Sequence, residues 1–325
     1  MLFSPPSSPP AMHIPDGFLS VWVSASFWII SAIVLTIALR KTSHSLEKRQ
    51  VPLMGVLAAA IFAGQMLNFS VAGGTSGHLL GAALAVILLG PWPAVVVMTS
   101  VVSVQALLFQ DGGILALGAN IFNMAIIGVF ISYTVFSVLA RLIKKRPIGL
   151  LVSGFTAAWS SIFVAALACG LQLAISGTSP ANIAIPAMAA IHALIGIGEG
   201  LITTGALTFL LATRADLLKP EGQAKVSHKG ILGVGSLIAV LLVFLSPFAS
   251  SHPDGLEWVA EQNSFLQTAR EAFYNIIPDY ALPGISNSAL ATIIAGLVGI
   301  VVVFAIAYLT ARAEKRSSAI ERLRD

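Results

Sequence analysis

Long apolar runs separated by short polar breaks constrain this chain more than any other feature of its sequence. Hydrophobic residues make up 57% of the 325 residues and charged residues only 10%, whereas about a quarter of the residues are charged in a typical soluble protein. A run of about 20 apolar residues is long enough to cross the hydrocarbon core of a bilayer as a helix. The sequence therefore predicts an all-α integral membrane protein.

Nine such runs are present, and we predict about nine transmembrane helices. They cover residues 20–39, 51–72, 79–89, 94–109, 114–140, 148–176, 183–213, 230–250 and 285–311. The third run is short, and the Gly90-Pro91-Trp92-Pro93 break follows it. Because proline interrupts helices, the third and fourth runs can be two helices or the halves of one broken helix.

The basic residues predict the orientation, because Lys and Arg in short loops accumulate on the cytoplasmic side. With nine crossings, one side receives four segments that hold every Lys and Arg except Arg270. These segments are 40–50, 141–147, 214–229 and 312–325. We therefore predict an outer N-terminus and a cytoplasmic C-terminus. This distribution explains the net charge of +4 as a topology signal, so we expect no nucleic-acid partner.

A change of character near residue 230 predicts two parts. Short turns link seven helices in a membrane domain, residues 12–213, and the cytoplasmic linker 214–229 joins it to a two-helix hairpin, residues 230–325. The hairpin helices flank a polar outer loop, residues 251–284. A single nine-helix domain is the alternative. Residues 1–11 are rich in Ser and Pro and lack the features of a signal peptide, so we expect a disordered leader or a misassigned start.

Two histidines lie in turns on the predicted outer face. Met12-His13 leads directly into the first helix. If the chain began at Met12, its amine, the His13 amide nitrogen and the imidazole would form one short chelate, a nitrogen set that late first-row divalent metals favour. His78 closes the glycine-rich turn 73–78 and could supply a fourth nitrogen. Alternatively, His13 is an ordinary interfacial residue and 73–78 a re-entrant turn.

Other polar residues near these turns have candidate supporting roles. A ligating imidazole needs a partner for its second ring nitrogen, and the candidates are Gln65, Asn68, Thr75 and Ser76. His192 and Glu199 share one helix face, where they could relay ions or form structural hydrogen bonds. Polar residues also crowd the outer turn between the fourth and fifth helices, where they could shape the site or satisfy backbone groups: Gln105, Gln110, Asp111, Asn120 and Asn123.

Several function classes find no support in the sequence. The single cysteine, Cys169, cannot form an intramolecular disulfide and is typical of a small core residue. The chain has no Gly-x-x-x-x-Gly-Lys-Ser/Thr phosphate loop, so we expect no ATPase site of its own. It has neither His-Glu-x-x-His nor Gly-x-Ser-x-Gly, which leaves a membrane hydrolase without support. We expect His44 and His228 to be solvated, and His252 to be a turn residue or an outer metal contact.

Three motifs together resemble those of a known transporter family. They are MHIPDGF at 12–18, GTSGHL at 74–79 and HALIGIGEG at 192–200, and they resemble the CbiM/NikM family, the substrate-capture component of cobalt and nickel energy-coupling-factor transporters. The resemblance covers about residues 12–225. The PDGLE motif at 253–257 resembles the small accessory subunit of the same systems, here fused as the C-terminal part.

The resemblance implies a function, a ligand set and partners. It implies capture of Co²⁺ or Ni²⁺ by the Met12 amine, the His13 amide and imidazole, and His78. It also implies a prokaryotic inner membrane, a membrane coupling protein, cytoplasmic ATPases, no catalytic residue and no permanent cofactor. Residues 1–11 depart from the family pattern, because they would convert the Met12 amine into an amide. We expect translation to begin at Met12, with cleavage of the leader or an altered binding mode as alternatives.

A competing hypothesis needs no partners. In a stand-alone secondary transporter or channel, His192 and Glu199 would relay protons or ions near the membrane midplane. A membrane enzyme that depends on Glu199 is a third reading, with little support from the sequence.

Overall fold

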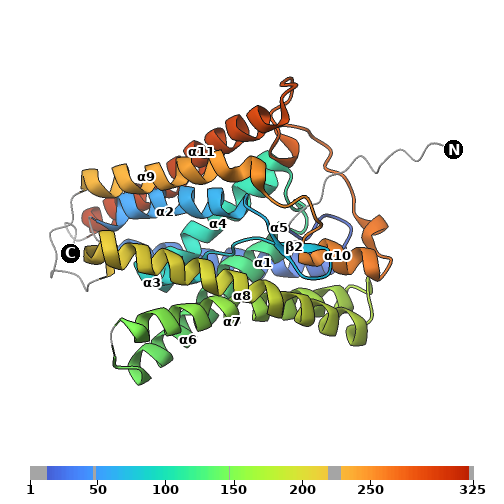
Figure 1. The fold of residues 1–325 in the computed structure, drawn as a ribbon, viewed down its shortest axis with the longest axis horizontal. Coiled ribbons are helices and arrows are strands. Elements are labelled where there is room, and N and C mark those ends of the chain that lie inside the picture. The colour runs from blue at the N-terminus through green and yellow to red at the C-terminus, as the bar shows by residue number, and fades with distance from the viewer. Residues whose placement is uncertain (1–12, 47–48, 146, 219–227, 322–325) are drawn as a thin grey trace.

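The computed structural model describes residues 13–46, 49–145, 147–218 and 228–321, which form mostly α-helices arranged along one long axis (Figure 1). The α-helices are α1 Val21–Ser45, α2 Gln50–Gln65, α3 Ala82–Leu89, α4 Pro91–Phe109, α5 Leu117–Asn120, α6 Gly128–Leu142, α7 Ile148–Ile175, α8 Ala181–Thr213, α9 His228–Leu245, α10 Gly255–Gln262 and α11 Ser288–Glu321. A π-helix, η1 Ile121–Ile127, joins α5 to α6, and the 3₁₀ turns are η2 Ala215–Leu218, η3 Ser246–Phe248, η4 Leu266–Thr268 and η5 Pro278–Tyr280. The prediction of a mainly helical membrane fold is confirmed.

Within the described ranges, seven helical stretches are long and apolar enough to cross a membrane. They are Val21–His44, Pro91–Phe109, Leu117–Leu142, Ile148–Ile175, Ala181–Thr213, Gly230–Phe248 and Ser288–Arg316. Helices also occupy the second and third predicted segments, but α2 has only 16 residues and α3 only 8. The seven stretches support a multi-pass membrane protein.

The second predicted helix ends earlier than expected. Instead of continuing to residue 72, it stops at Gln65, and Phe69–Val71 forms strand β1, which pairs antiparallel with β2, Thr75–Gly77. The connecting Gly73 and Gly74 have φ of 81° and 77°, a left-handed conformation that glycine adopts without strain. The predicted glycine-rich turn is therefore a β-hairpin, and His78 follows it directly.

The third and fourth predicted segments are separate helices joined at one residue. Gly90 alone separates α3 from α4, with φ of 80°. Pro91 is the first residue of α4, where a missing N–H leaves no helical hydrogen bond unmade. The fourth helix therefore begins three residues before the predicted start, because two prolines that read as breakers lie in its first turn.

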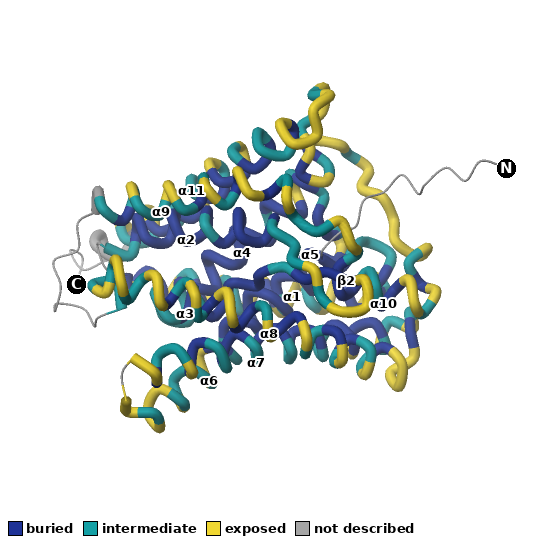
Figure 2. Tube along the Cα trace, in the orientation of Figure 1, coloured by how far each residue is buried: buried dark blue, intermediate teal, exposed yellow. Residues whose placement is uncertain are grey.

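Helix α2 is almost entirely buried, whereas the outer helices have many exposed residues (Figure 2). Every α2 residue is buried except Gln50 and Ala60. By contrast, Ile29 of α1 is 63% exposed and Val301 of α11 is 65% exposed. Exposed large apolar side chains along a helix match a lipid environment.

The two C-terminal helices pack closely against α2. A Cβ atom at Gly55 would lie 2.9 Å from the Phe304 ring of α11, and one at Gly235 of α9 would overlap Val56. Small residues at these contacts let helix backbones approach, which is a common mode of packing between membrane helices. The N-terminal and C-terminal parts therefore share one hydrophobic core.

Gly235→Ala should destabilise the protein, whereas Gly233→Ala in the same helix should not. A Cβ at Gly235 overlaps Val56, while one at Gly233 meets no atom within 4 Å. Overpacking costs about 1–3 kcal/mol, and a harmless Gly→Ala change in a helix gains up to about 1 kcal/mol. Thermal unfolding in detergent measures both variants. Equal melting temperatures would contradict the close packing of α9 on α2.

Candidate metal centre

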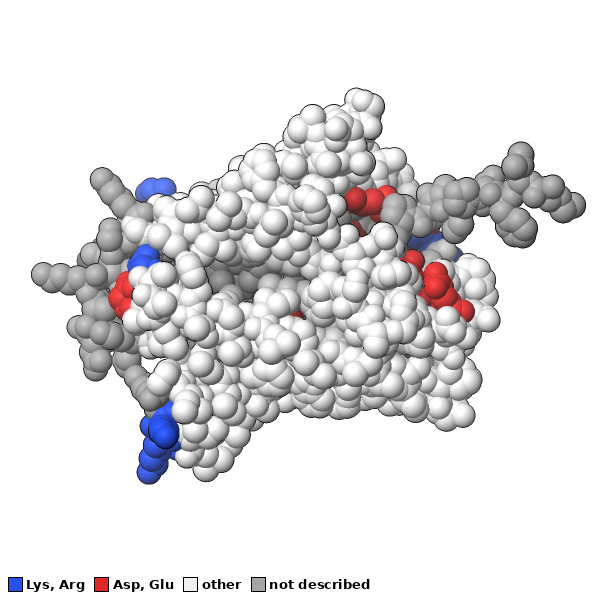
Figure 3. Space-filling model, viewed as in Figure 1, with Lys and Arg blue, Asp and Glu red and all other residues white. Residues whose placement is uncertain are grey.

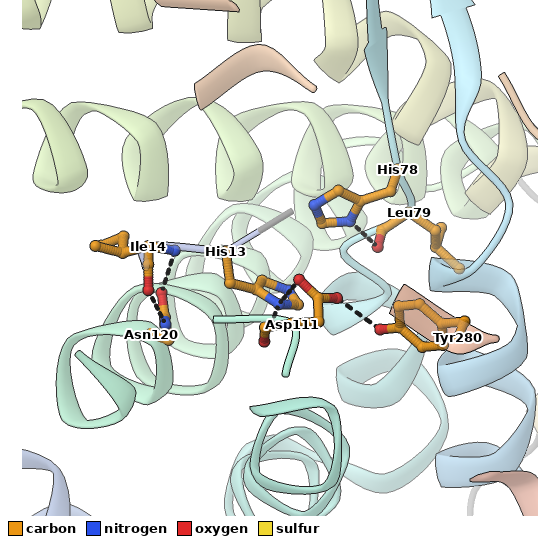
Figure 4. A network of polar contacts seen from close by, with 7 residues as sticks. All are labelled: His13, Ile14, His78, Leu79, Asp111, Asn120 and Tyr280. Carbon is orange, nitrogen blue, oxygen red and sulfur yellow. Dashed lines mark hydrogen bonds and ion pairs between the residues drawn. The ribbon is translucent and has the colours of Figure 1, made fainter. Parts of the chain in front are cut away.

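The segment that carries His13 is docked on the turn that follows α4 (Figure 4). The Ile14 N–H donates to Asn120 Oδ1 at 3.0 Å, and the Asn120 side-chain amide donates back to the Ile14 carbonyl at 3.0 Å. The Gly113 N–H also donates to the Ile14 carbonyl, at 2.9 Å. These bonds hold His13 in a buried position, with 4% of its surface exposed.

The imidazole of His13 faces Asp111. Its Nδ1 lies 3.2 Å from the Asp111 carbonyl oxygen and 3.1 Å from Asp111 Oδ1. Since both oxygens only accept hydrogen bonds, Nδ1 is the donor, and in the neutral ring Nε2 carries the lone pair. Burial alone would lower the pKa of His13, but the charge and hydrogen bonds of Asp111 raise it above its ordinary value.

His78 meets His13 although 65 positions of sequence separate them. The two ring centroids are 5.5 Å apart, with an edge-to-face angle of 75°. His78 Nδ1 donates to the Leu79 carbonyl oxygen at 3.0 Å, so its Nε2 also carries the lone pair in the neutral ring. The structure thus brings the two predicted imidazoles together.

Glu199 holds the backbone just after His78. The Leu80 N–H donates to Glu199 Oε2 at 2.7 Å and the Gly81 N–H donates to Oε1 at 3.0 Å. From the other side, the Gln65 side chain donates to the Leu80 carbonyl at 2.8 Å. Residues 80–81 are therefore fixed outside α3, which begins at Ala82 rather than at 79 as predicted. Both carboxylate oxygens of Glu199 serve this backbone, an arrangement that favours a positioning role over an ion relay.

Most of the residues predicted to hydrogen-bond the ring nitrogens of the histidines bond to main-chain carbonyl groups instead. Thr75 Oγ1 donates to the Pro253 carbonyl at 3.1 Å, and Ser76 Oγ donates to the His252 carbonyl at 2.8 Å. Within the described part of the chain, Asn68 Oδ1 is buried without a hydrogen-bond partner. These hydrogen bonds join the hairpin to the PDGLE segment, so Gln65, Thr75 and Ser76 hold backbone near His78. Met12 lies outside the described residues.

A small cavity of about 80 Å³ lies beside the two histidines. A third histidine, His192 of α8, lines it, and its Nδ1 donates to the Met188 carbonyl at 2.9 Å. Cys169 and Asp254 also line this cavity. Among the described residues, no group of three or more His, Cys, Asp or Glu side chains is arranged to hold a metal ion.

Two residues of the C-terminal part complete the surroundings, and the sequence analysis gave neither a role. Asp254 caps α10 by accepting from the Glu257 N–H at 2.8 Å, and burial raises its pKa well above its usual range. The Tyr280 hydroxyl donates to Asp111 Oδ2 at 2.6 Å. The PDGLE motif could have pointed to Asp254, but no sequence pattern near Tyr280 indicates a role for it.

Comparisons with known proteins find two family models that match this chain. A family model described as "Cobalt uptake substrate-specific transmembrane region" matches residues 13–217. The chain belongs to this family. A second model, the PDGLE domain, matches residues 229–316. Both matches confirm the resemblance drawn from the motifs.

Two fused relatives match nearly the full length of this chain. A putative fused nickel transport protein NikMN of Archaeoglobus fulgidus is 36% identical over 93% of this chain and 98% of its own length. A fused nickel transport protein NikMN of Rhodobacter capsulatus is 28% identical over 90% of this chain and 95% of its own. A crystal structure of a truncated transition metal transporter matches with a TM-score of 0.56 and 38% identity, over 62% of this chain and 98% of that one.

Glu199→Gln should loosen the backbone around His78. A glutamine can offer only one oxygen to the Leu80 and Gly81 N–H groups, so one of them loses its acceptor. A buried unsatisfied donor costs about 1–3 kcal/mol. Thermal unfolding and hydrogen exchange at residues 78–81 measure the effect. Thr208→Val, at an exposed position of the same helix, is the control, and equal exchange in both variants would exclude this role for Glu199.

Glu257 should make stability fall as the pH rises. Burial raises its pKa from 4.5 to about 7, so the folded protein resists the ionisation that the unfolded chain undergoes. The stabilising contribution is complete below pH 4.5 and is lost as the pH rises through about 7. Glu257→Gln should remove this loss, which thermal unfolding from pH 4 to about pH 8 measures. Parallel pH profiles of variant and unaltered protein would contradict the assignment.

Proposed function

We propose that this chain captures Co²⁺ or Ni²⁺ at the outer face of a membrane and delivers it inward as a component of a transport system. The observation that carries the proposal is the buried contact between the His13 and His78 rings, 5.5 Å apart. The family match supports a role in cobalt or nickel transport, with the metal ion as transported substrate rather than a permanent cofactor.

The ligand set combines side-chain and main-chain nitrogen. Two imidazoles alone do not hold a divalent ion firmly, and the described residues offer no third His, Cys, Asp or Glu in position. The His13 amide nitrogen and the Met12 amine supply the remaining donors. An all-nitrogen set favours late first-row metals such as Ni²⁺ and Co²⁺ over Mg²⁺ or Ca²⁺, which prefer oxygen.

Charge distribution supports the orientation with the site outside. Most of the visible Lys and Arg gather at the left end of the molecule, and most visible Asp and Glu lie at the right end, near α10 (Figure 3). Basic ends face the cytoplasm. In the proposed arrangement all nine helical segments cross or enter the inner membrane of a prokaryote, with the short α2 and α3 enclosed by longer helices.

The chain acts with partners in this proposal. Captured metal must be released inward, and the sequence lacks the phosphate loop of an ATPase. A membrane coupling protein and cytoplasmic ATPases of the energy-coupling-factor type would supply that energy. Residues 12–213 form the capture domain, 214–229 the linker and 230–325 the accessory domain, as the two separate family matches support.

His13→Ala and His78→Ala should each lower the affinity for Ni²⁺ by more than about a hundredfold, because each removes one nitrogen from the inner coordination sphere. Ni²⁺ titration of the purified full-length protein measures binding, and intact mass with N-terminal sequencing determines whether Met12 carries a free amine. His44→Ala, an exposed histidine at the far end of α1, is the control. Normal binding by both site variants would reject the proposed centre.

A further inference from the structure

Tyr280 reaches the metal centre from the C-terminal part of the chain. Its hydroxyl donates to Asp111 Oδ2 at 2.6 Å, while Asp111 Oδ1 lies 3.1 Å from His13 Nδ1. The contacts thus run from Tyr280 through Asp111 to His13 without interruption (Figure 4). All three residues are buried, with at most 9% of any of them exposed.

The backbone around Tyr280 is built to aim this hydroxyl. Asp279 and Tyr280 have φ of 56° and 55°, a left-handed conformation that costs free energy in residues other than glycine. The Ile277 N–H donates to the Leu108 carbonyl at 3.1 Å, which anchors the segment on the last turn of α4. The Tyr280 ring stacks on Phe109 with centroids 4.8 Å apart. Anchored on both sides, the strained segment holds the hydroxyl against Asp111.

Chelate geometry determines which ring nitrogen of His13 can bind a metal ion together with the His13 amide nitrogen. The amide nitrogen and Nδ1 of the same histidine close a six-membered ring around a metal ion, whereas Nε2 lies on the far side of the imidazole and cannot close that ring. In the structure, Nδ1 is the nitrogen that faces Asp111. A metal ion chelated by His13 and Asp111 therefore compete for the same atom.

We propose that Asp111 and Tyr280 are positioning residues that set how readily His13 binds metal. Asp111 holds the His13 imidazole at Nδ1 in two ways, through its main-chain carbonyl, which accepts the hydrogen bond, and through the charge of Oδ1 at 3.1 Å. The Tyr280 hydroxyl weakens the second contact, because its hydrogen bond to Oδ2 draws negative charge away from Oδ1. The accessory part thereby tunes metal capture through one phenol. This inference rests on the proposed capture of metal by His13.

Tyr280→Phe is the deciding variant. It keeps the stacking on Phe109 but leaves Asp111 Oδ2 without this donor, so the carboxylate binds His13 Nδ1 more strongly. Affinity for Ni²⁺ should fall about tenfold, the scale of one charge-assisted hydrogen bond. The absorption spectrum of the Ni²⁺ complex should stay unchanged, because the ligand set is the same. Tyr274→Phe is the matched control, since its hydroxyl donates to the Ala106 carbonyl of α4 at 2.7 Å and not to Asp111.

A double-mutant cycle tests whether Tyr280 acts through Asp111. Ni²⁺ titrations of full-length protein in detergent compare Tyr280→Phe in the unaltered protein and in an Asp111→Asn background, with thermal unfolding as a check of folding. The tenfold loss should shrink to less than about twofold in that background, because the two sites are coupled. Tyr274→Phe should have the same small effect in both.

Three results would overturn the proposal. Tighter Ni²⁺ binding by Tyr280→Phe would show that Asp111 attracts the metal rather than competing with it. An equal loss in Tyr274→Phe, or an undiminished loss in the Asp111→Asn background, would mean that Tyr280 only docks the loop. Loss of binding in folded Asp111→Asn would exclude a competitor. If instead His13→Ala and His78→Ala both bind Ni²⁺ normally, the proposed function itself fails.

Discussion

The hydrogen bonds that the Leu80 and Gly81 N–H groups donate to Glu199 are the interaction on which the candidate metal centre depends. Non-helical backbone within a membrane bundle is tolerated only where protein groups satisfy its N–H and C=O groups. Between α2 and α3 the chain leaves the helical conformation, and Glu199 from α8 supplies two acceptors there. A carboxylate at this position also faces the N-terminus of α3, where a negative charge is favourable. The backbone that follows His78 is thereby held by a residue of another helix.

The need to satisfy non-helical backbone groups also explains why the outer loop of the C-terminal part is folded onto the candidate metal centre. It pairs with each of the three segments that surround the histidines. The Ser76 N–H donates to the Pro253 carbonyl at 2.8 Å, the Arg270 N–H donates to the Asp16 carbonyl at 2.7 Å, and the Tyr274 hydroxyl donates to the end of α4. Backbone groups that would otherwise be unsatisfied at the edge of the bundle are therefore bonded to residues 250–280. The accessory part is a structural component of the site rather than an appended hairpin.

Sequence reasoning succeeded where the signal is local. Apolar run length predicted the helical segments, and the glycine-rich turn placed His78 on the correct loop. It failed at helix ends such as 66–72, because Phe69 and Val71 are apolar enough to extend a helix and only pairing with Thr75 and Gly77 makes them a strand. Asp111 was assigned to the right turn with two open roles, whereas Asn120 lies in α5 and binds the backbone of Ile14. Tyr280 could not be found, since its partner is 169 positions away and a lone tyrosine in a polar loop carries no pattern.

The size and the lining of the cavity beside His13 and His78 limit the kinds of ion that it can hold. Its volume of about 80 Å³ leaves room for an ion with a few bound waters, since one water needs about 10–15 Å³ of cavity volume. Its walls are mostly apolar, and His13, His78 and His192 are the histidines that line it. In the capture that we propose, a metal ion exchanges bound water for nitrogen ligands, which Mg²⁺ does reluctantly and late first-row metals do readily. His78 and His192 engage Nδ1 in a hydrogen bond, which leaves Nε2 with the lone pair, whereas at His13 the hydrogen bond occupies Nδ1, the nitrogen that the proposed chelate uses. Selectivity is therefore a property of the protein's hydrogen bonds as much as of the ligands themselves.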